Sequence, residues 1–178
     1  FEVLATGGDS ALGGDDLDHR LFCWIIAQAQ LKPLSPEVTR TLLGQAREVK
    51  ERLSSRVKTR LEATLQSGEH VDLDITAETF EQITHHLVCK TAKLTREALH
   101  AAYLAPEDVQ GVVLIGGATR MPHVRREVQK LFGKTPHANI DPEKVVALGA
   151  AMQANLLAGN RPPGDDWLLL DVIPLSLG

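Results

Sequence analysis

Aromatic residues are scarce in this chain. Phenylalanine, tryptophan and tyrosine make up 4% of its 178 residues, which argues against the aromatic platforms on which single-stranded nucleic acids stack. Basic residues are not in excess either, because 19 lysines and arginines face 23 aspartates and glutamates, for a net charge of −4. Both deficits predict that neither a nucleic acid nor a membrane surface is a partner.

Cysteines and long apolar runs are also few. Two cysteines, Cys23 and Cys89, make no disulfide framework, so we expect a reducing, cytoplasmic environment. The longest apolar runs, such as LFCWIIA, are too short to span a bilayer. No GxxxxGK[ST] phosphate loop is present. Phe1 lies within FEVLAT, a stretch typical of a strand, and we therefore expect the chain to be a fragment.

Helix start signals and periodicity predict most of the remaining elements. One helix begins at three carboxylates that oppose its dipole, and another over 34–55 begins with Ser35 as N-cap before Pro36. Alternating apolar residues predict a hairpin with one wet face. A long helix, a strand buried on both faces and two more helices should follow. The carboxylates at the first helix are Asp15, Asp16 and Asp18, and the apolar face of the hairpin consists of Val57, Leu61, Ala63, Leu65, Val71, Leu73 and Ile75. The long helix is expected over 77–102, the buried strand GVVLI over 111–115, and the last two helices over 122–132 and 139–159. The last of these has Asp141 as N-cap and ends on Gly159.

This order predicts an α/β fold with an inserted lobe. The outer elements form half of a layered α/β domain, and the helix–helix–hairpin segment forms a separate α+β lobe. We expect a subdomain of residues 1–12 and 85–160, an inserted lobe over 13–84, a linker over 161–172 and the start of a further domain at 173–178.

The stretch VVLIGGATRMPHV, residues 112–124, is the most informative for function. Gly116 and Gly117 leave bare backbone at the carboxyl end of the predicted strand, where α/β folds bind ligands. The planar guanidinium of Arg120 suits stacking on a base, and Pro122 starts a helix whose free N–H groups favour an anion. From these residues alone, a plain strand-to-helix turn with a surface arginine remains an equal alternative.

VVLIGGATRMP is similar to the adenosine motif of the actin-like ATPases. The whole chain resembles the C-terminal half, lobe II, of the ATPase domain of the seventy-kilodalton heat-shock chaperones, which implies an actin-like, ribonuclease H-like fold. The tail resembles the linker and first strand of the peptide-binding domain, which other actin-like ATPases lack. Two segments favour the HscA branch, which serves iron–sulfur cluster assembly, over the DnaK branch. The matching segments are FEVLATGGDSALGGDDLDHRL, EVKERLSS, IDPEKVVALGAAMQA and LLLDVIPLSLG, and those that favour HscA are ATGGDSALGGDD and DVIPLSLG.

The resemblance implies an adenosine-binding set. The turn from Gly117 to Arg120 would face the adenosine, with Arg120 against the adenine and Gly116 supporting the turn. Lys50 and Ser54 would reach the ribose and the adenine edge. The full set is Gly14, at the ribose–phosphate side, Lys50, Ser54, Gly116, Gly117, Ala118, Thr119, Arg120 and Glu143, near the base.

Three positions depart from the family pattern. Ala118 replaces the usual serine, Arg47 replaces a frequent glutamate, and Glu51 replaces an arginine that stacks in many members. Because each lost contact costs about 1 kcal/mol, we expect a looser adenosine clamp than in the general chaperones.

The resemblance also implies the cofactor and partners. ATP or ADP would bind, with Mg²⁺ in the intact domain, and the partners would be a J-domain co-chaperone and either an iron–sulfur scaffold or unfolded peptides, held by the domain beyond this chain. The phosphate loops and catalytic residues would precede Phe1, so we assign no catalytic residue or metal ligand and expect no ATP hydrolysis by the chain alone. His85, His86 and Cys89 are too few for a metal site. Two alternatives are a small-molecule kinase of the same superfamily and a protein-interaction module that binds no nucleotide.

Overall fold

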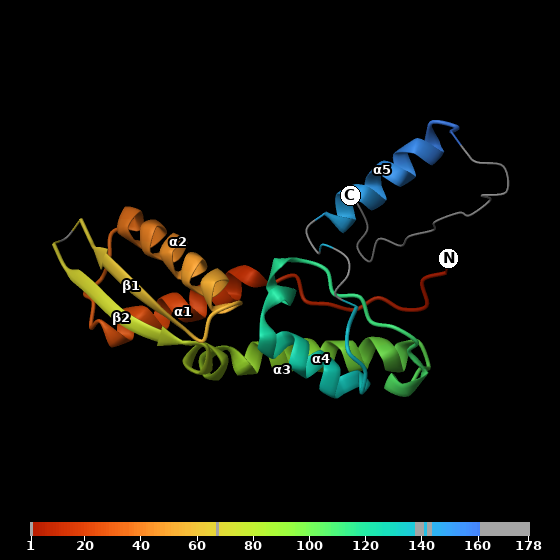
Figure 1. Ribbon diagram of the computed structural model, residues 1–178, viewed down its shortest axis with the longest axis horizontal. Helices are drawn as coiled ribbons and strands as arrows, with labels where there is room; N and C mark the ends of the chain where they lie inside the picture. The colour runs from red at the N-terminus through yellow and green to blue at the C-terminus, as the bar shows by residue number, and fades with distance from the viewer. Residues whose placement is uncertain (1, 67, 138–140, 142–143, 161–178) are drawn as a thin grey trace.

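The computed structural model describes residues 2–66, 68–137, 141 and 144–160, and the predicted linker and tail over 161–178 lie outside them. Two helices and a hairpin form one part of the molecule, and α3 leads from the hairpin to a second part in which α4 packs along it (Figure 1). The predicted combination of helix and sheet is confirmed. The elements are α1 (Gly14–Gln28), α2 (Pro36–Leu53), β1 (Lys58–Thr64), β2 (His70–Thr76), α3 (Ala77–Ala101), the 3-10 turns η1 (Pro106–Asp108) and η2 (Gly117–Arg120), α4 (Pro122–Phe132) and α5 (Val145–Leu157).

Side chains cap the first helices as their sequences indicate. The Ser35 hydroxyl accepts a hydrogen bond from the Val38 N–H at 3.3 Å, which confirms the predicted start of α2. At α1 the Asp16 carboxylate accepts from the Gly13 N–H at 2.7 Å. Asp16 therefore satisfies a backbone donor at the helix start, and Asp15 lies in the same first turn, as expected. The expectation for Asp18 was wrong, because it lies in the second turn, is buried and pairs with Lys50.

The hairpin covers one face of α1 and α2 and supplies part of the core. β1 and β2 pair antiparallel with Leu61 opposite Leu73, and the other face carries the ion pairs of Arg60 with Asp72 and of Lys58 with Asp74. The prediction for Val57 was wrong, because it precedes β1 and is exposed. The core residues are Leu17, Leu21, Phe22, Ile25, Val38, Leu42, Ala46, Val49, Leu53, Leu61, Ala63, Leu65, Val71, Ile75, Phe80 and Met121.

The two other predicted strands are not formed in the described residues. Residues 2–6 adopt no strand, and within 111–115 a single parallel bridge joins Val113 to His137. Val113 and Ile115 are 47% and 50% exposed, so the expectation of burial on both faces was wrong. A β-prone segment becomes a strand only when a neighbour satisfies its backbone, and the sheet that the structure describes contains only β1 and β2.

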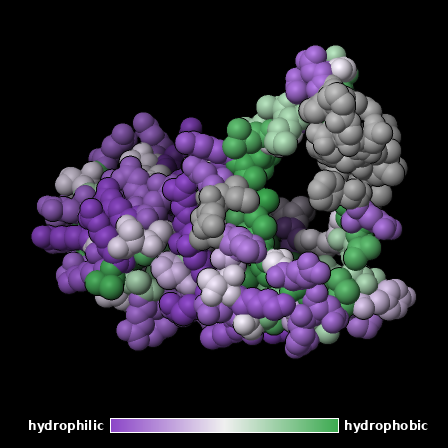
Figure 2. All heavy atoms as spheres, turned by 45° about the vertical axis from the view of Figure 1, so that its right-hand side comes forward, coloured by the Kyte–Doolittle hydropathy of each residue, from purple (hydrophilic) through white to green (hydrophobic). Residues whose placement is uncertain are grey.

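The predicted start of the last helix, with Pro142 at its first position, lies partly outside the described residues. α5 is described from Val145, and the Asp141 backbone carbonyl accepts hydrogen bonds from the N–H groups of Lys144 at 3.2 Å and Val145 at 3.1 Å. The Asp141 carboxylate forms ion pairs with Arg120 at 3.5 Å and with Lys144 at 3.7 Å. Gly159, with φ of +85°, follows the helix end as predicted. The surface of α5 is largely hydrophobic (Figure 2).

Tyr103 provides a test of helix termination. It follows the C-cap of α3 with φ of +57° and is 95% exposed, so it carries backbone strain without burying its ring. We expect Tyr103→Gly to raise the free energy of unfolding by about 1 kcal/mol, measured by urea denaturation. Tyr103→Ala is the control, because it removes the ring and keeps the strain. An equal gain in both variants would contradict this explanation.

His123 makes stability depend on pH. It is buried between α3 and α4, with Nε2 3.4 Å from the Thr84 hydroxyl and its ring edge-to-face with Phe80. Burial lowers the pKa of His123 from 6.5, and Glu81 only partly opposes this shift. The fold therefore favours neutral histidine, so this contribution to stability is complete above pH 6.5 and is lost as the pH falls towards the lowered pKa.

We expect His123→Gln to flatten the decline in unfolding free energy below pH 6.5. Urea unfolding at a series of pH values measures this decline. His86→Gln, on the exposed face of α3, should keep the wild-type dependence. A wild-type slope in the His123 variant would show that other groups cause the decline.

Candidate functional site

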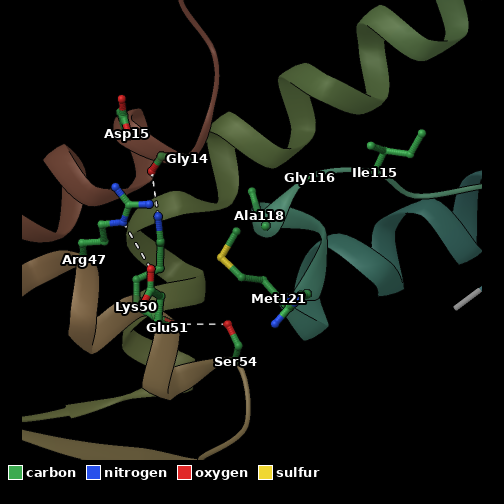
Figure 3. A pocket seen from close by; sticks show the side chains of 12 residues that line it. Gly14, Asp15, Arg47, Lys50, Glu51, Ser54, Ile115, Gly116, Ala118 and Met121 are labelled. Carbon is green, nitrogen blue, oxygen red and sulfur yellow. Dashed lines mark hydrogen bonds and ion pairs between the residues drawn. The ribbon is translucent and has the colours of Figure 1, made fainter. Parts of the chain in front are cut away.

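A cleft of about 460 Å³ lies between the two parts of the molecule (Figure 3). One wall is formed by the start of α1 and the last two turns of α2, and the other by the turn around η2. Its volume is in the range of small-molecule sites. The lining residues are Gly14, Asp15, Arg47, Lys50, Glu51, Ser54, Ile115, Gly116, Gly117, Ala118, Arg120 and Met121.

Helical spacing places four side chains of α2 on the cleft wall. Positions 47, 50, 51 and 54 are related as i, i+3, i+4 and i+7, so they form one stripe. Val49 and Leu53 are buried on the core side of the same helix. Packing of α2 against α1 and β1 therefore fixes the direction in which this stripe faces.

The opposite wall depends on the conformation of Gly116. Its φ of +94° and ψ of 150° belong to a region that essentially only glycine adopts. The carbonyl of Gly116 accepts hydrogen bonds from the Thr119 hydroxyl at 2.6 Å and from the Thr119 N–H at 3.0 Å. Arg125 Nε, from α4, donates to the Thr119 carbonyl at 2.9 Å. These bonds hold the turn, and Thr119 supports the cleft without lining it.

Met121 connects the cleft to the core. It is buried within the core cluster, and its side chain extends from the turn towards α2 (Figure 3). Ala118 packs against the same cluster and also lines the cleft. The apolar part of the cleft lining is therefore continuous with the hydrophobic core.

The cationic side chains of the cleft are paired with carboxylates. Lys50 Nζ lies 2.7 Å from Asp18 Oδ1 and donates to the Gly14 carbonyl at 3.1 Å. Burial raises the pKa of Asp18, and the Lys50 ammonium opposes this effect. At the rim, Arg47 Nε lies 3.2 Å from Glu51. The two α2 departures noted in the sequence thus form one ion pair.

A model of the family described as Hsp70 protein matches residues 1–178. The chain belongs to the Hsp70 family. It is 66% identical to the chaperone protein HscA homolog of Herminiimonas arsenicoxydans, 64% to that of Janthinobacterium sp. (strain Marseille) and 63% to that of Cupriavidus necator. Each match covers the whole chain and 29% of the relative, so the chain spans less than a third of the proteins that it matches.

These similarities confirm the family and the HscA branch predicted from the sequence. They also remove the small-molecule kinase alternative. Among the residues that the structure describes, no helix combines the length and apolar character needed to cross a membrane. Within the same residues, no three histidine, cysteine, aspartate or glutamate side chains are grouped to hold a metal ion.

Seven of the nine predicted site residues line the cleft of this Hsp70-family chain. Thr119 belongs to the η2 turn but does not line the cleft, and Glu143 is outside the described residues. Five other residues line the cleft without having been predicted as site residues. The seven are Gly14, Lys50, Ser54, Gly116, Gly117, Ala118 and Arg120, and the five are Asp15, Arg47, Glu51, Ile115 and Met121. Arg47 and Glu51 were named from the sequence only as departures from the family's clamp, and helical spacing from Lys50 could have placed them on the same wall. Met121 carried no signal that separated it from the core.

Proposed function

We propose that this chain forms the adenosine side of the nucleotide site of an Hsp70-type chaperone ATPase. Hsp70-family ATPases bind ATP and ADP with Mg²⁺. The observation that carries the proposal is the cleft that brings Lys50 and Ser54 of α2 opposite the bare Gly116–Gly117 backbone. A glycine backbone lets a flat base approach closely, and Arg120 on the same wall offers a planar guanidinium for stacking.

We assign individual roles from the family resemblance, and the positions of the described residues are compatible with them. Lys50 faces the cleft with an ammonium suited to a ribose hydroxyl. The Ser54 hydroxyl donates to the Lys50 carbonyl at 3.3 Å, so its oxygen can accept from an adenine amine. Ala118 offers no hydroxyl, which is consistent with a looser clamp. Gly14 borders the ribose–phosphate side, and we assign Glu143 to the base edge from the resemblance alone.

The metal and the hydrolytic chemistry belong elsewhere in the proposed assembly. We propose no metal ligand and no catalytic residue in this chain, and among the described residues no three histidine, cysteine, aspartate or glutamate side chains are grouped to hold a metal ion. In the complete chaperone, ATP hydrolysis would control peptide binding with a J-domain co-chaperone, for iron–sulfur scaffold or unfolded clients. We place this activity in the cytoplasm, where the free, exposed Cys23 and Cys89 would remain reduced.

We propose a division at the cleft. Residues 13–84 form a lobe, residues 1–12 and 85–160 form the adenosine-binding subdomain, and Gly13 with Gly14 forms part of the connection. This division is supported by the position of the cleft, between α2 and the η2 turn. Residues 161–172 would link to a peptide-binding domain that starts at 173–178.

Calorimetric titration of the full-length gene product with adenosine and with ADP and Mg²⁺ tests the proposed function. We expect calorimetry to show saturable binding of both ligands. NMR spectra should show chemical-shift changes at the η2 turn when they bind. Absence of binding would favour the interaction module. Binding that leaves the turn unperturbed would place the adenosine elsewhere.

A further inference from the structure

We propose that Asp18 is a positioning residue that neutralises Lys50 and fixes its ammonium in the cleft wall, so that Lys50 recognises a neutral hydroxyl and not a phosphate. The proposal rests on the proposed nucleotide site and assigns a function to a residue outside the predicted set. Asp18 does not line the cleft and would act through Lys50.

The pair is built into the fold. Asp18 lies in the second turn of α1 and Lys50 near the end of α2, and their side chains are 8% and 10% exposed. Burying two charges is unfavourable unless they are close together, and here Nζ and Oδ1 are 2.7 Å apart. Packing of α1 on α2 thus requires Lys50 to remain where Asp18 and the Gly14 carbonyl hold it.

The contacts of Lys50 leave capacity for one more partner. An ammonium has three N–H donors. In the described structure, Nζ donates a hydrogen bond to the Gly14 carbonyl and forms an ion pair with Asp18 Oδ1. At least one donor therefore remains for a ligand in the cleft, and the two fixed contacts restrict its direction.

The charge balance of the cleft favours an uncharged ligand group. Each cationic side chain that lines it has a carboxylate partner, and Asp15 adds a further carboxylate to the lining. A phosphate would enter a region without net positive charge, whereas a ribose hydroxyl can accept a hydrogen bond without a charge partner. The three ion pairs are Arg47–Glu51, Lys50–Asp18 and Arg120–Asp141.

The test compares ADP with 2′-deoxy-ADP and 3′-deoxy-ADP, using calorimetric dissociation constants for the full-length gene product. We expect one deoxy analogue to bind wild type about tenfold more weakly than ADP, as for a hydrogen bond to a charged donor. Lys50→Met and Asp18→Asn should each bring that ratio to within about twofold of one. A general structural loss would weaken both nucleotides alike and leave the ratio unchanged.

A matched pair on the hairpin controls for the loss of an ion pair. Lys58 and Asp74 are also 2.7 Å apart, but they are exposed and do not line the cleft. Lys58→Met and Asp74→Asn should keep the wild-type ratio. If Asp18→Asn keeps it as well, Asp18 does not position Lys50 and the proposal is overturned.

A second measurement does not depend on the folding of the Asp18 variant. Lys50→Met should weaken adenosine and ADP by the same factor, because Lys50 contacts no phosphate in this proposal. A loss that grows with the number of phosphates would overturn it. If wild type binds neither adenosine nor ADP, both the proposed function and this inference fail. If wild type binds ADP and both deoxy analogues with equal affinity, only this inference is overturned.

Discussion

Gly116→Ala is expected to weaken adenosine and ADP binding by about tenfold or more, since it forces a backbone strain of about 1–3 kcal/mol onto the cleft wall. The φ of +94° and ψ of 150° are unfavourable for any L side chain, although a Cβ at this position would meet no atom within 4 Å. The turn must therefore change its backbone conformation. That change moves the carbonyl that accepts from Thr119, and calorimetric titration measures the resulting loss.

Gly133→Ala is the matched control. Gly133 also has a positive φ, +64°, and a Cβ there would meet open space, but this glycine caps α4 and does not line the cleft. Its left-handed conformation costs alanine about 1–2 kcal/mol of stability. Nucleotide affinity should stay at the wild-type value. If both variants lose affinity equally, the cause is general destabilisation and not the geometry of the η2 turn.

Local sequence rules predicted the elements whose stabilising contacts are local. Ser35 and Pro36 identify the start of α2 because capping involves residues three apart. The alternating apolar residues of both strands, such as Val71 and Ile75 in the second, identify the hairpin. The rule works here because the two strands are adjacent in sequence and pair with each other. Val57 shows the limit of the same rule, because it continues the alternation but lies one residue before the strand begins and is exposed.

Strands that need a distant neighbour could not be predicted with equal success. GVVLI has the composition of a buried strand, but composition does not supply a partner, and Val113 bridges only to His137 in the described residues. A second long-range contact, that of Asp141, was missed for a related reason. Its backbone carbonyl accepts hydrogen bonds at the start of α5, which suits the predicted N-cap, but nothing in the local sequence indicates that its carboxylate pairs with Arg120, 21 residues earlier.

The candidate site shows the same division. The glycine turn is contiguous, so a motif predicts it, and α2 presents its stripe by simple periodicity. The Asp18–Lys50 pair joins two helices across 32 residues. In the sequence, Asp18 cannot be told apart from the two carboxylates just before it, because all three suit the start of a helix. Only the packing of α1 against α2 separates Asp18 from Asp15 and Asp16.

Leu42→Ala is expected to lower the free energy of unfolding of the α1–α2–hairpin part by about 2–5 kcal/mol. Leu42 is 0% exposed within the core between α1, α2 and the hairpin, so its truncation removes apolar contacts and leaves a cavity. α2 also carries the cleft stripe on its other face, so increased opening of this helix should weaken nucleotide binding as well. Native-state hydrogen exchange of α1, α2, β1 and β2 amides measures the opening free energy of this part.

The same substitution at an exposed leucine separates burial from helix propensity. Leu148→Ala in α5 removes the same atoms from a side chain that is 62% exposed, and alanine is at least as good a helix former as leucine. We expect it to change stability by less than about 0.5 kcal/mol. A similar loss in both variants would mean that Leu148 is covered in the full-length protein. A small loss at Leu42 would mean that the core between α1 and α2 closes over the missing side chain, and that the cleft wall tolerates repacking behind it.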